Sequence, residues 1–279
     1  MSQRFNRTVK IVGAGRTDAG VHATNQAFHF NVFPREIKSK KMSHEGSSSH
    51  SDTTEEERKE NDEFCRELQY SLNRMLRNDI RVWNICQAPP PQLVTMANGK
   101  EEIFSWHVIY NSVKKLYTYR LSLEPEARTF DPLERFTRVH VEGNIDPRKL
   151  ELVLRHFEGT HDFRAFAGAI EANQRKKGIE HKDTVRTIYS VDLIPEGNGK
   201  YRIEIMLKGA LYKMVRNIVG TALEVSKGRM DEERMLQMLH HSNCTDGNTQ
   251  FVRKDNKCKP AHPEGLTLEG VFYDDSDNF

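Results

Sequence analysis

The sequence contains few cysteines and no long hydrophobic run, and these two features argue against a disulfide-built secreted domain and a membrane-spanning protein. Four of the 279 residues are cysteine and none belongs to a CxxC pair, which argues against a disulfide-built secreted domain and favours reduced thiols. No stretch approaches the roughly 18 consecutive apolar residues of a membrane-spanning helix, so we expect no membrane contact. The opening MSQRFNRTVK also lacks the apolar segment of a secretory signal. We therefore expect a cytoplasmic location, while mitochondrial and nuclear locations stay open.

The glycine-rich stretch VKIVGAGRTDAG, residues 9–20, lacks what phosphate-binding loops need. A dinucleotide fingerprint has a third glycine where this sequence has Asp18, and it leads into a helix. Here the chain continues into NQAFHFNVF, whose alternation is typical of a strand. A P-loop fails as well, because no Lys-Ser/Thr pair follows Gly20. What remains is a carboxylate on a tight, glycine-flanked loop, with Arg16 two residues before it.

The net charge of +2 hides an uneven distribution. Residues 52–63 hold seven acidic and two basic residues, a local balance of −5, so the rest of the chain carries +7. A folded part with this excess of positive charge is basic enough to bind a polyanion such as RNA, although a solvated surface explains the same net charge.

Two polar stretches interrupt the segments that we expect to fold. Residues 38–62 are Ser-rich and charged with a single apolar residue, Met42, and we expect them to form a disordered insertion. Residues 169–187 are polar, basic and too long for a simple connector, which favours a lid or an RNA-contacting loop over a solvated excursion.

The remaining periodicity predicts an α+β fold. Helices are expected at 63–77, 146–159, 210–226 and 232–241, and strands at 79–86, 101–110, 114–123 and 266–273, with a hairpin over 185–209. Asp146 is the expected N-cap and Gly159 the expected C-cap of the second helix. These elements lack the strict βαβ rhythm of a parallel sheet, so we expect an antiparallel one.

Three residue types could carry chemistry. Asp18 is a candidate nucleophile if a nearby guanidinium keeps it ionised, although an aspartate in TDAG also commonly bonds its own turn. Arg216 lies among apolar neighbours in YKMVRNIVG, so it needs an anionic partner, which could be Asp18, a phosphate or another acid. Tyr117 and Tyr119 share one face of a strand, where one could stack on a nucleobase or both could be core residues.

One arrangement of possible metal ligands stays open. His240, Cys244, Cys258 and His262 follow the spacing H-x3-C-x13-C-x3-H, which is near that of zinc ligands. Because His and Cys fall at such intervals by chance and the order is unusual, we expect no metal here.

Six ordered blocks resemble the signature blocks of the TruA-type tRNA pseudouridine synthases. They are AGRTDAGVHA (14–23), LNRMLRNDIRV (72–82), KKLYTYRL (114–121), FEGTHDFRAF (157–166), YKMVRNIVG (212–220) and KPAHPEGLTLEGVFY (259–273). The resemblance covers nearly the whole chain outside the insertion. One difference is that the family's usual opening strand, which precedes GRTDAG, has no counterpart here, so we expect a sheet that lacks it.

The resemblance implies a fold and a set of partners. It implies two ferredoxin-like lobes, residues 1–110 with the nucleophile loop and residues 111–279, forming a mixed, mainly antiparallel sheet with a central basic cleft. It also implies a homodimer that binds tRNA and requires no cofactor.

The same resemblance implies roles for the site residues. Asp18 matches the family's nucleophile, Tyr117 the tyrosine that packs on the target base, and Arg216 the arginine that pairs with the nucleophile. Arg16 matches a loop arginine associated with flipping the nucleotide. The expected activity is isomerisation of uridine to pseudouridine in the anticodon arm of tRNA. A catalytically weak or inactive RNA-binding relative is the alternative, and the target uridine stays open.

Overall fold

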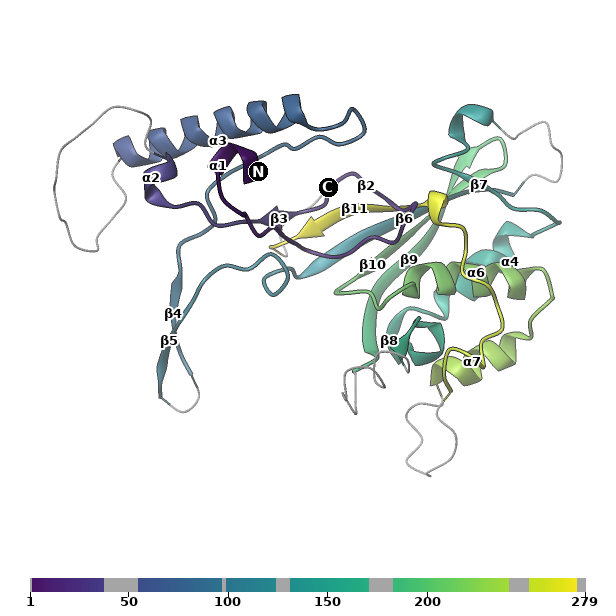
Figure 1. The fold of residues 1–279 in the computed structure, drawn as a ribbon. Helices are drawn as coiled ribbons and strands as arrows, with labels where there is room; N and C mark the ends of the chain where they lie inside the picture. The colour runs from purple at the N-terminus through teal and green to yellow at the C-terminus, as the bar shows by residue number, and fades with distance from the viewer. Residues whose placement is uncertain are drawn as a thin grey trace. The chain divides into compact units, whose positions relative to one another are not determined.

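The computed structural model divides into two compact units (Figure 1). One unit contains residues 1–13 and 28–111, and the other contains residues 14–27 and 112–279. The Asp18 loop therefore packs with the second unit, while the division into lobes at residue 110 stays a prediction. The residues described are 2–37, 55–96, 99–123, 131–170, 183–240 and 251–274.

The second unit is built on a mixed, mainly antiparallel sheet. Its strand order is β2-β11-β6-β10-β9-β8, and β7 also pairs with β6. The pairs β2–β11 and β6–β7 are parallel and the others are antiparallel. This confirms the α+β class and the antiparallel character; ferredoxin-like lobes stay a prediction. The strands are β2 (His22–Ala23), β6 (Lys114–Ser122), β7 (Val139–His140), β8 (Gly159–Asp162), β9 (Val185–Gly197), β10 (Lys200–Leu207) and β11 (Leu266–Phe272).

The predicted hairpin over 185–209 is confirmed as β9 and β10. Asn198 and Gly199 form its turn with φ of +50° and +67°, a backbone that asparagine and glycine tolerate better than other residues. This turn matches the right-handed twist of the two strands, so β9 folds back directly onto β10.

Three helices pack together beside the sheet and complete the core. They are α4 (Pro147–Arg155), α6 (Met214–Ser226) and α7 (Glu232–His240). Helix α6 contacts both α4 and α7, and α4 contacts β9 (Figure 1). Most of α6 is buried, which explains its apolar sequence. The core therefore lies between one face of the sheet and this helix layer.

Helix α4 begins as predicted and ends earlier. The side chain of Asp146 accepts a hydrogen bond from the Arg148 N–H at 2.9 Å, as expected of an N-cap. The helix ends at Arg155, with His156 as C-cap, so Gly159 does not cap it. With φ of +99°, Gly159 instead opens β8, where its freedom allows the chain to reverse.

The first unit holds a long helix, α3 (Glu55–Met75), that starts earlier than predicted. Residues 55–62, which we expected to be disordered, form its first two turns. Three glutamates in the first turn stabilise the helix N-terminus through the helix dipole. The rest of the predicted insertion, residues 38–54, lies outside the described residues.

The predicted strand at 79–86 is wrong. Its backbone is irregular because side chains of α3 take the hydrogen bonds that a partner strand would form. Asn73 bonds both backbone groups of Val82, through Nδ2 to the carbonyl at 2.7 Å and through Oδ1 from the N–H at 2.8 Å. Gln69 Oε1 accepts from the Ile85 N–H at 3.2 Å.

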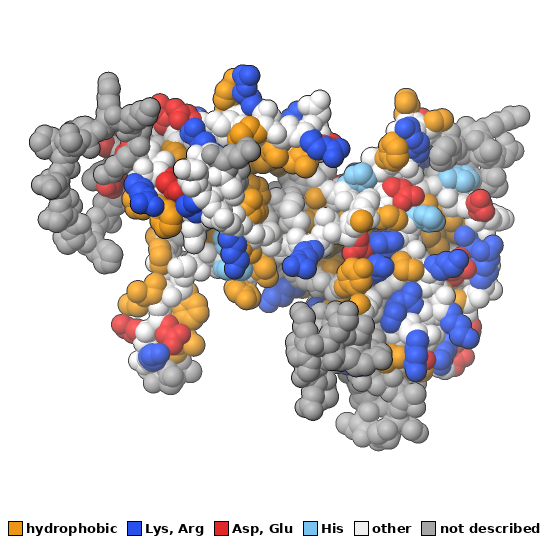
Figure 2. Space-filling model, in the orientation of Figure 1, with side chains coloured by type: hydrophobic (Ala, Val, Ile, Leu, Met, Phe, Trp, Pro, Cys, Tyr) orange, Lys and Arg blue, Asp and Glu red, His pale blue; other side chains and the backbone are white. Residues whose placement is uncertain are grey.

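The remaining elements of the first unit are short. The expected strand at 101–110 covers only β5, which pairs with β4 in a hairpin that presents exposed hydrophobic side chains (Figure 2). Within the described ranges no helix is both long and apolar enough to cross a membrane. The short elements are α1 (Ser2–Phe5), α2 (Pro34–Ile37), β1 (Val12–Gly13), β3 (Phe28–His29), β4 (Gln92–Thr95) and β5 (Glu101–Phe104).

Candidate active site

Asp18 lies on a tight turn in the loop that joins β1 to β2. Its backbone carbonyl accepts a hydrogen bond from the Val21 N–H at 3.1 Å. Gly20 has φ of +82°, and a Cβ at this position would lie 3.0 Å from Cγ of Pro263. Glycine therefore meets two requirements of the turn: a left-handed backbone and a close approach to the side chain of Pro263. Since the backbone closes the turn, the Asp18 carboxylate is available for a different partner.

That partner is Arg216 in the first turn of α6. Nη1 of Arg216 donates to Oδ2 of Asp18 at 2.8 Å, and the two side chains are 12% and 16% exposed. Nε of Arg216 donates to the Ala261 carbonyl at 2.8 Å, and the Ala261 N–H donates to the Arg216 carbonyl at 2.9 Å. The guanidinium is thus held at two points in a largely buried position, where a charge-assisted hydrogen bond is strong.

The segment from Lys259 to Ala261 crosses close over α6 and brings Ala261 to Arg216. A Cβ added at Gly220 would lie 2.2 Å from the Lys259 carbonyl oxygen and 2.9 Å from the Ala261 nitrogen. Only glycine at this helix position leaves room for the segment that supplies the Ala261 carbonyl. Packing at Gly220 therefore determines how Arg216 is oriented toward Asp18.

The two candidate tyrosines of β6 have different surroundings. Tyr119 is 1% exposed and its hydroxyl donates to the His262 carbonyl at 3.0 Å, so it is a core residue. Tyr117 is partly buried, and its strand neighbours are Ile205 on β10 and Leu268 on β11. Burial raises the pKa of Tyr117 to about 12, so its hydroxyl is neutral at physiological pH. The arrangement leaves Tyr117 as the tyrosine that a ligand could reach.

Arg16 lies on the same loop as Asp18 and is exposed. Within the described part of the chain it has no recorded hydrogen bond or ion pair. The structure therefore brings Asp18 and Arg216 together and leaves the Arg16 guanidinium at the surface.

Lys115 is a residue near the loop that sequence reasoning missed. It is 7% exposed, and its Nζ donates to the Ala14 carbonyl at 2.7 Å. Burial lowers the pKa of this ammonium below its ordinary value. The alternation of side chains along β6 could have identified Lys115, because it places Lys115 on the same face of the strand as Tyr117 and Tyr119.

A second polar cluster lies on the other face of β6. Oε1 of Glu269 accepts hydrogen bonds from Thr118 at 2.8 Å and from Arg120 at 2.9 Å, and Oε2 accepts from Thr24 at 2.6 Å. Burial acts to raise the pKa of Glu269, but these hydrogen bonds outweigh it and hold the pKa below its ordinary value. Glu269, itself on β11, thus ties β6 to Thr24, the residue that follows β2.

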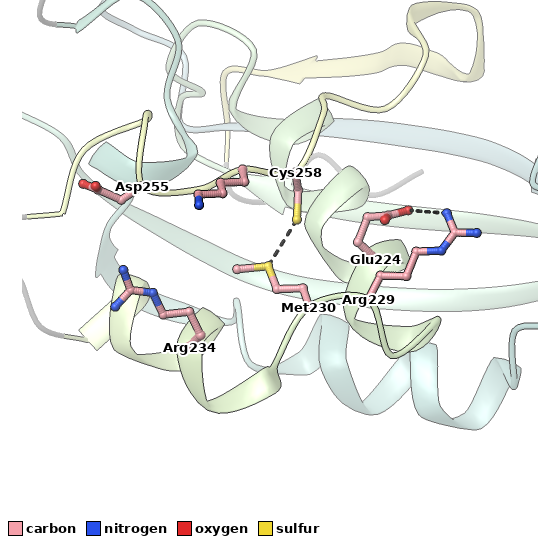
Figure 3. Close-up of a pocket in the computed structure, with 7 residues that line it drawn as sticks. Glu224, Arg229, Met230, Arg234, Asp255 and Cys258 are labelled. Atoms are coloured by element: carbon pink, nitrogen blue, oxygen red, sulfur yellow. Dashed lines mark hydrogen bonds and ion pairs between the residues drawn. The ribbon is translucent and has the colours of Figure 1, made fainter.

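Of the four residues that suggested a zinc site, only Cys258 and His262 have described side chains, so the expectation that they bind no metal stays a prediction. Cys244 lies outside the described residues, and the side chain of His240 is not described. Most of the basic stretch 169–187, expected to form a lid or an RNA-contacting loop, also lies outside them. Cys258 lines a cavity of about 380 Å³ and donates to Sδ of Met230 at 3.1 Å (Figure 3). Burial raises the pKa of its thiol. Among described residues, no group of three His, Cys, Asp or Glu side chains could hold a metal.

Comparison with known proteins places this chain in a family. Residues 153–274 match the family model described as tRNA pseudouridine synthase. The chain is 32% identical to tRNA pseudouridine synthase A 1 of Protochlamydia amoebophila over 266 residues, which cover 95% of this chain and 80% of that protein. It is 29% identical to tRNA pseudouridine synthase A 2 of a Bacillus cereus strain over 274 residues, covering 98% of this chain and 86% of that protein. The chain belongs to the tRNA pseudouridine synthase A (TruA) family, which is a family of isomerases.

Proposed function

We propose that this protein isomerises uridine to pseudouridine in the anticodon arm of tRNA, with Asp18 as the nucleophile. The observation that carries the proposal is the largely buried ion pair between Asp18 and Arg216, at 2.8 Å. A largely buried carboxylate that a guanidinium holds in one orientation is suited to attack on a sugar. The names of the relatives agree with tRNA as the substrate.

The reaction changes which atom of uracil is bonded to ribose, from N1 to C5, and it adds or removes no atoms overall. The glycosidic bond from N1 of uracil to C1′ of ribose breaks, and the Asp18 carboxylate attacks the sugar or assists formation of a glycal. The freed uracil then rotates and C5 bonds to C1′, while the bond from Asp18 to C1′ breaks or, on the glycal route, the proton that Asp18 took from C2′ returns to C2′. The proton of C5 finally leaves to a base and N1 gains a proton. Because the rearrangement is redox-neutral, we propose that it proceeds without a cofactor.

Arg216 has the role of holding the nucleophile. It binds Oδ2 of Asp18, and Oδ1 has no recorded partner within the described residues, so we assign Oδ1 as the attacking atom. The second hydrogen bond of Arg216, to Ala261, prevents the guanidinium from following the carboxylate away from the site. Orientation of this kind contributes to catalysis because a misplaced nucleophile reacts slowly.

Tyr117 and Arg16 have substrate-binding roles in this proposal. The target uridine must leave its stack to reach Asp18, and exposed Arg16 on the same loop would take its place. The ring of Tyr117 would supply a flat surface for the rotating base. Figure 2 shows Lys and Arg side chains gathered over the helical part of the second unit, and we propose that such surface binds the tRNA backbone. We also propose a homodimer as the binding form.

The test is release of tritium from tRNA labelled at C5 of uracil. Asp18→Asn keeps the shape of the side chain and removes its charge, and Asp192→Asn is the matched control on an exposed position of β9. We expect the wild type and the control to release tritium and Asp18→Asn to release none. Labelling only the anticodon arm then tests the target region.

Two results would contradict the proposal. Release by Asp18→Asn at the wild-type rate would remove Asp18 from the mechanism. Binding of tRNA by the wild type without any release would instead identify a catalytically weak or inactive RNA-binding relative.

A further inference from the structure

Lys115 carries a buried positive charge that the proposed reaction does not use. Its side chain is 7% exposed, and β6 holds it in register between Leu207 on β10 and Val271 on β11. Buried ammonium groups are costly unless they are paired, usually with a carboxylate. No ion pair recorded among the described residues includes Lys115, and its recorded hydrogen bond goes to a backbone carbonyl. Among the described residues, the Lys115 ammonium is therefore bound by a backbone carbonyl and not by a carboxylate.

The carbonyl that Lys115 binds lies at the beginning of the nucleophile loop. Nζ of Lys115 is 2.7 Å from the oxygen of Ala14, four residues before Asp18. A Cβ on Gly15 would lie 3.5 Å from the same Nζ, which shows that the ammonium packs directly against the loop backbone. Lys115 therefore contacts the loop where it leaves β1.

Two further hydrogen bonds hold the same part of the loop. The Ala14 N–H donates to the Ala27 carbonyl at 2.8 Å, and Nε2 of Gln26 donates to the Gly15 carbonyl at 3.0 Å. Both carbonyls at the start of the loop are thus bound by side chains from outside it. At the other end, Arg216 binds the Asp18 carboxylate itself.

We propose that Lys115 is a positioning residue for the reaction, which sets the backbone of the nucleophile loop so that Asp18 meets both Arg216 and the sugar. The inference rests on the proposed function, since it assumes that Asp18 attacks. The Asp18 side chain has only two rotatable bonds, so the place of its carboxylate follows the place of its backbone. A displacement of about 1 Å at a reacting group lowers a rate by about 100-fold.

A lysine that only stabilised the fold would behave differently. Its loss would lower the melting temperature and leave the turnover of the remaining folded protein unchanged. Loss of a positioning residue lowers turnover in protein that is fully folded, and it leaves tRNA affinity nearly unchanged because the RNA-binding surface is intact.

The experiment compares Lys115→Met with Lys114→Met. Lys114 is the preceding residue of β6, its side chain points to the opposite face, and its ammonium lies 5.3 Å from the ring centre of Phe272. Both variants remove one positive charge from the same strand. Single-turnover tritium release, tRNA affinity and hydrogen exchange of the peptide covering residues 14–23 are measured at a temperature where circular dichroism shows folded protein. If Lys115→Met does not fold, Lys115→Gln, whose amide is too short to reach Ala14, replaces it.

The expected result is a fall in the single-turnover rate of about 10- to 100-fold for Lys115→Met, with tRNA affinity within about threefold of wild type and faster exchange in the 14–23 peptide. Lys114→Met should keep the wild-type rate and exchange. A wild-type rate for Lys115→Met, or unchanged exchange, would overturn the inference. If the wild type itself releases no tritium, the proposed function fails, and the exchange measurement still decides whether Lys115 holds the loop.

Discussion

The ion pair between Asp18 and Arg216 allows a quantitative test of how the fold holds the candidate nucleophile. The perturbation is a double-mutant cycle built from Asp18→Ala, Arg216→Met and the double variant. At 2.8 Å and with side chains 12% and 16% exposed, the pair is a charge-assisted hydrogen bond with little screening by solvent. Such a bond contributes about 1.5–3 kcal/mol to the free energy of unfolding, and we expect a coupling energy in this range.

The protein supplies a matched control pair for this cycle. Arg155 and Glu151 on α4 lie 2.9 Å apart, nearly the same distance, but their side chains are 55% and 42% exposed. Solvent screens such a pair and its side chains lose entropy on pairing, so its coupling should be several-fold smaller. Comparison of the two cycles shows how much more a buried pair contributes than an exposed pair at nearly the same N–O distance.

The assay is urea denaturation followed by circular dichroism at neutral pH, with thermal unfolding as a second measurement. Arg216→Met should be the more damaging single variant, because it also removes the hydrogen bond to Ala261 and leaves the Asp18 carboxylate buried without a partner. A coupling energy for Asp18 and Arg216 no larger than that of the exposed pair would refute the reasoning. It would mean that the site does not hold the carboxylate through Arg216.

Two further predictions concern the surroundings of the site. Gly220→Ala should lower the free energy of unfolding by about 1–3 kcal/mol, because its methyl group would force the Lys259 carbonyl away from α6, and tritium release should fall with it; wild-type stability measured by urea denaturation would contradict this. Glu269 has a folded-state pKa below its ordinary value of 4.5, so its carboxylate stabilises the fold at neutral pH, and that contribution is lost as the pH falls below about 4.5. Glu269→Gln should therefore be less stable at neutral pH and lose less stability on acidification, as thermal unfolding across this pH range will show; parallel acid curves for the two proteins would contradict it.

Regular, amphipathic elements could be predicted well from the sequence. The hairpin of β9 and β10 and the N-terminus of α4 follow from local chemistry, namely the Asn198-Gly199 turn and the Asp146 cap. The strand expected at 79–86 failed because its alternation carries no information about partners. Asn73 on α3 takes the backbone hydrogen bonds of Val82, a contact that periodicity does not encode.

The sequence by itself determined the α+β class and the residues worth examining, because strand and helix periods and the blocks around Asp18, Tyr117 and Arg216 are local patterns. Only the tertiary structure decided which groups meet. Asp18 and Arg216 are separated by 198 positions and lie 2.8 Å apart, and Lys115 reaches Ala14 across 101 positions. Such contacts depend on the register of β6 in the sheet and on the close crossing at Gly220, and both arise from packing of the whole unit. A linear pattern names the candidate groups, and folding brings them within hydrogen-bonding distance.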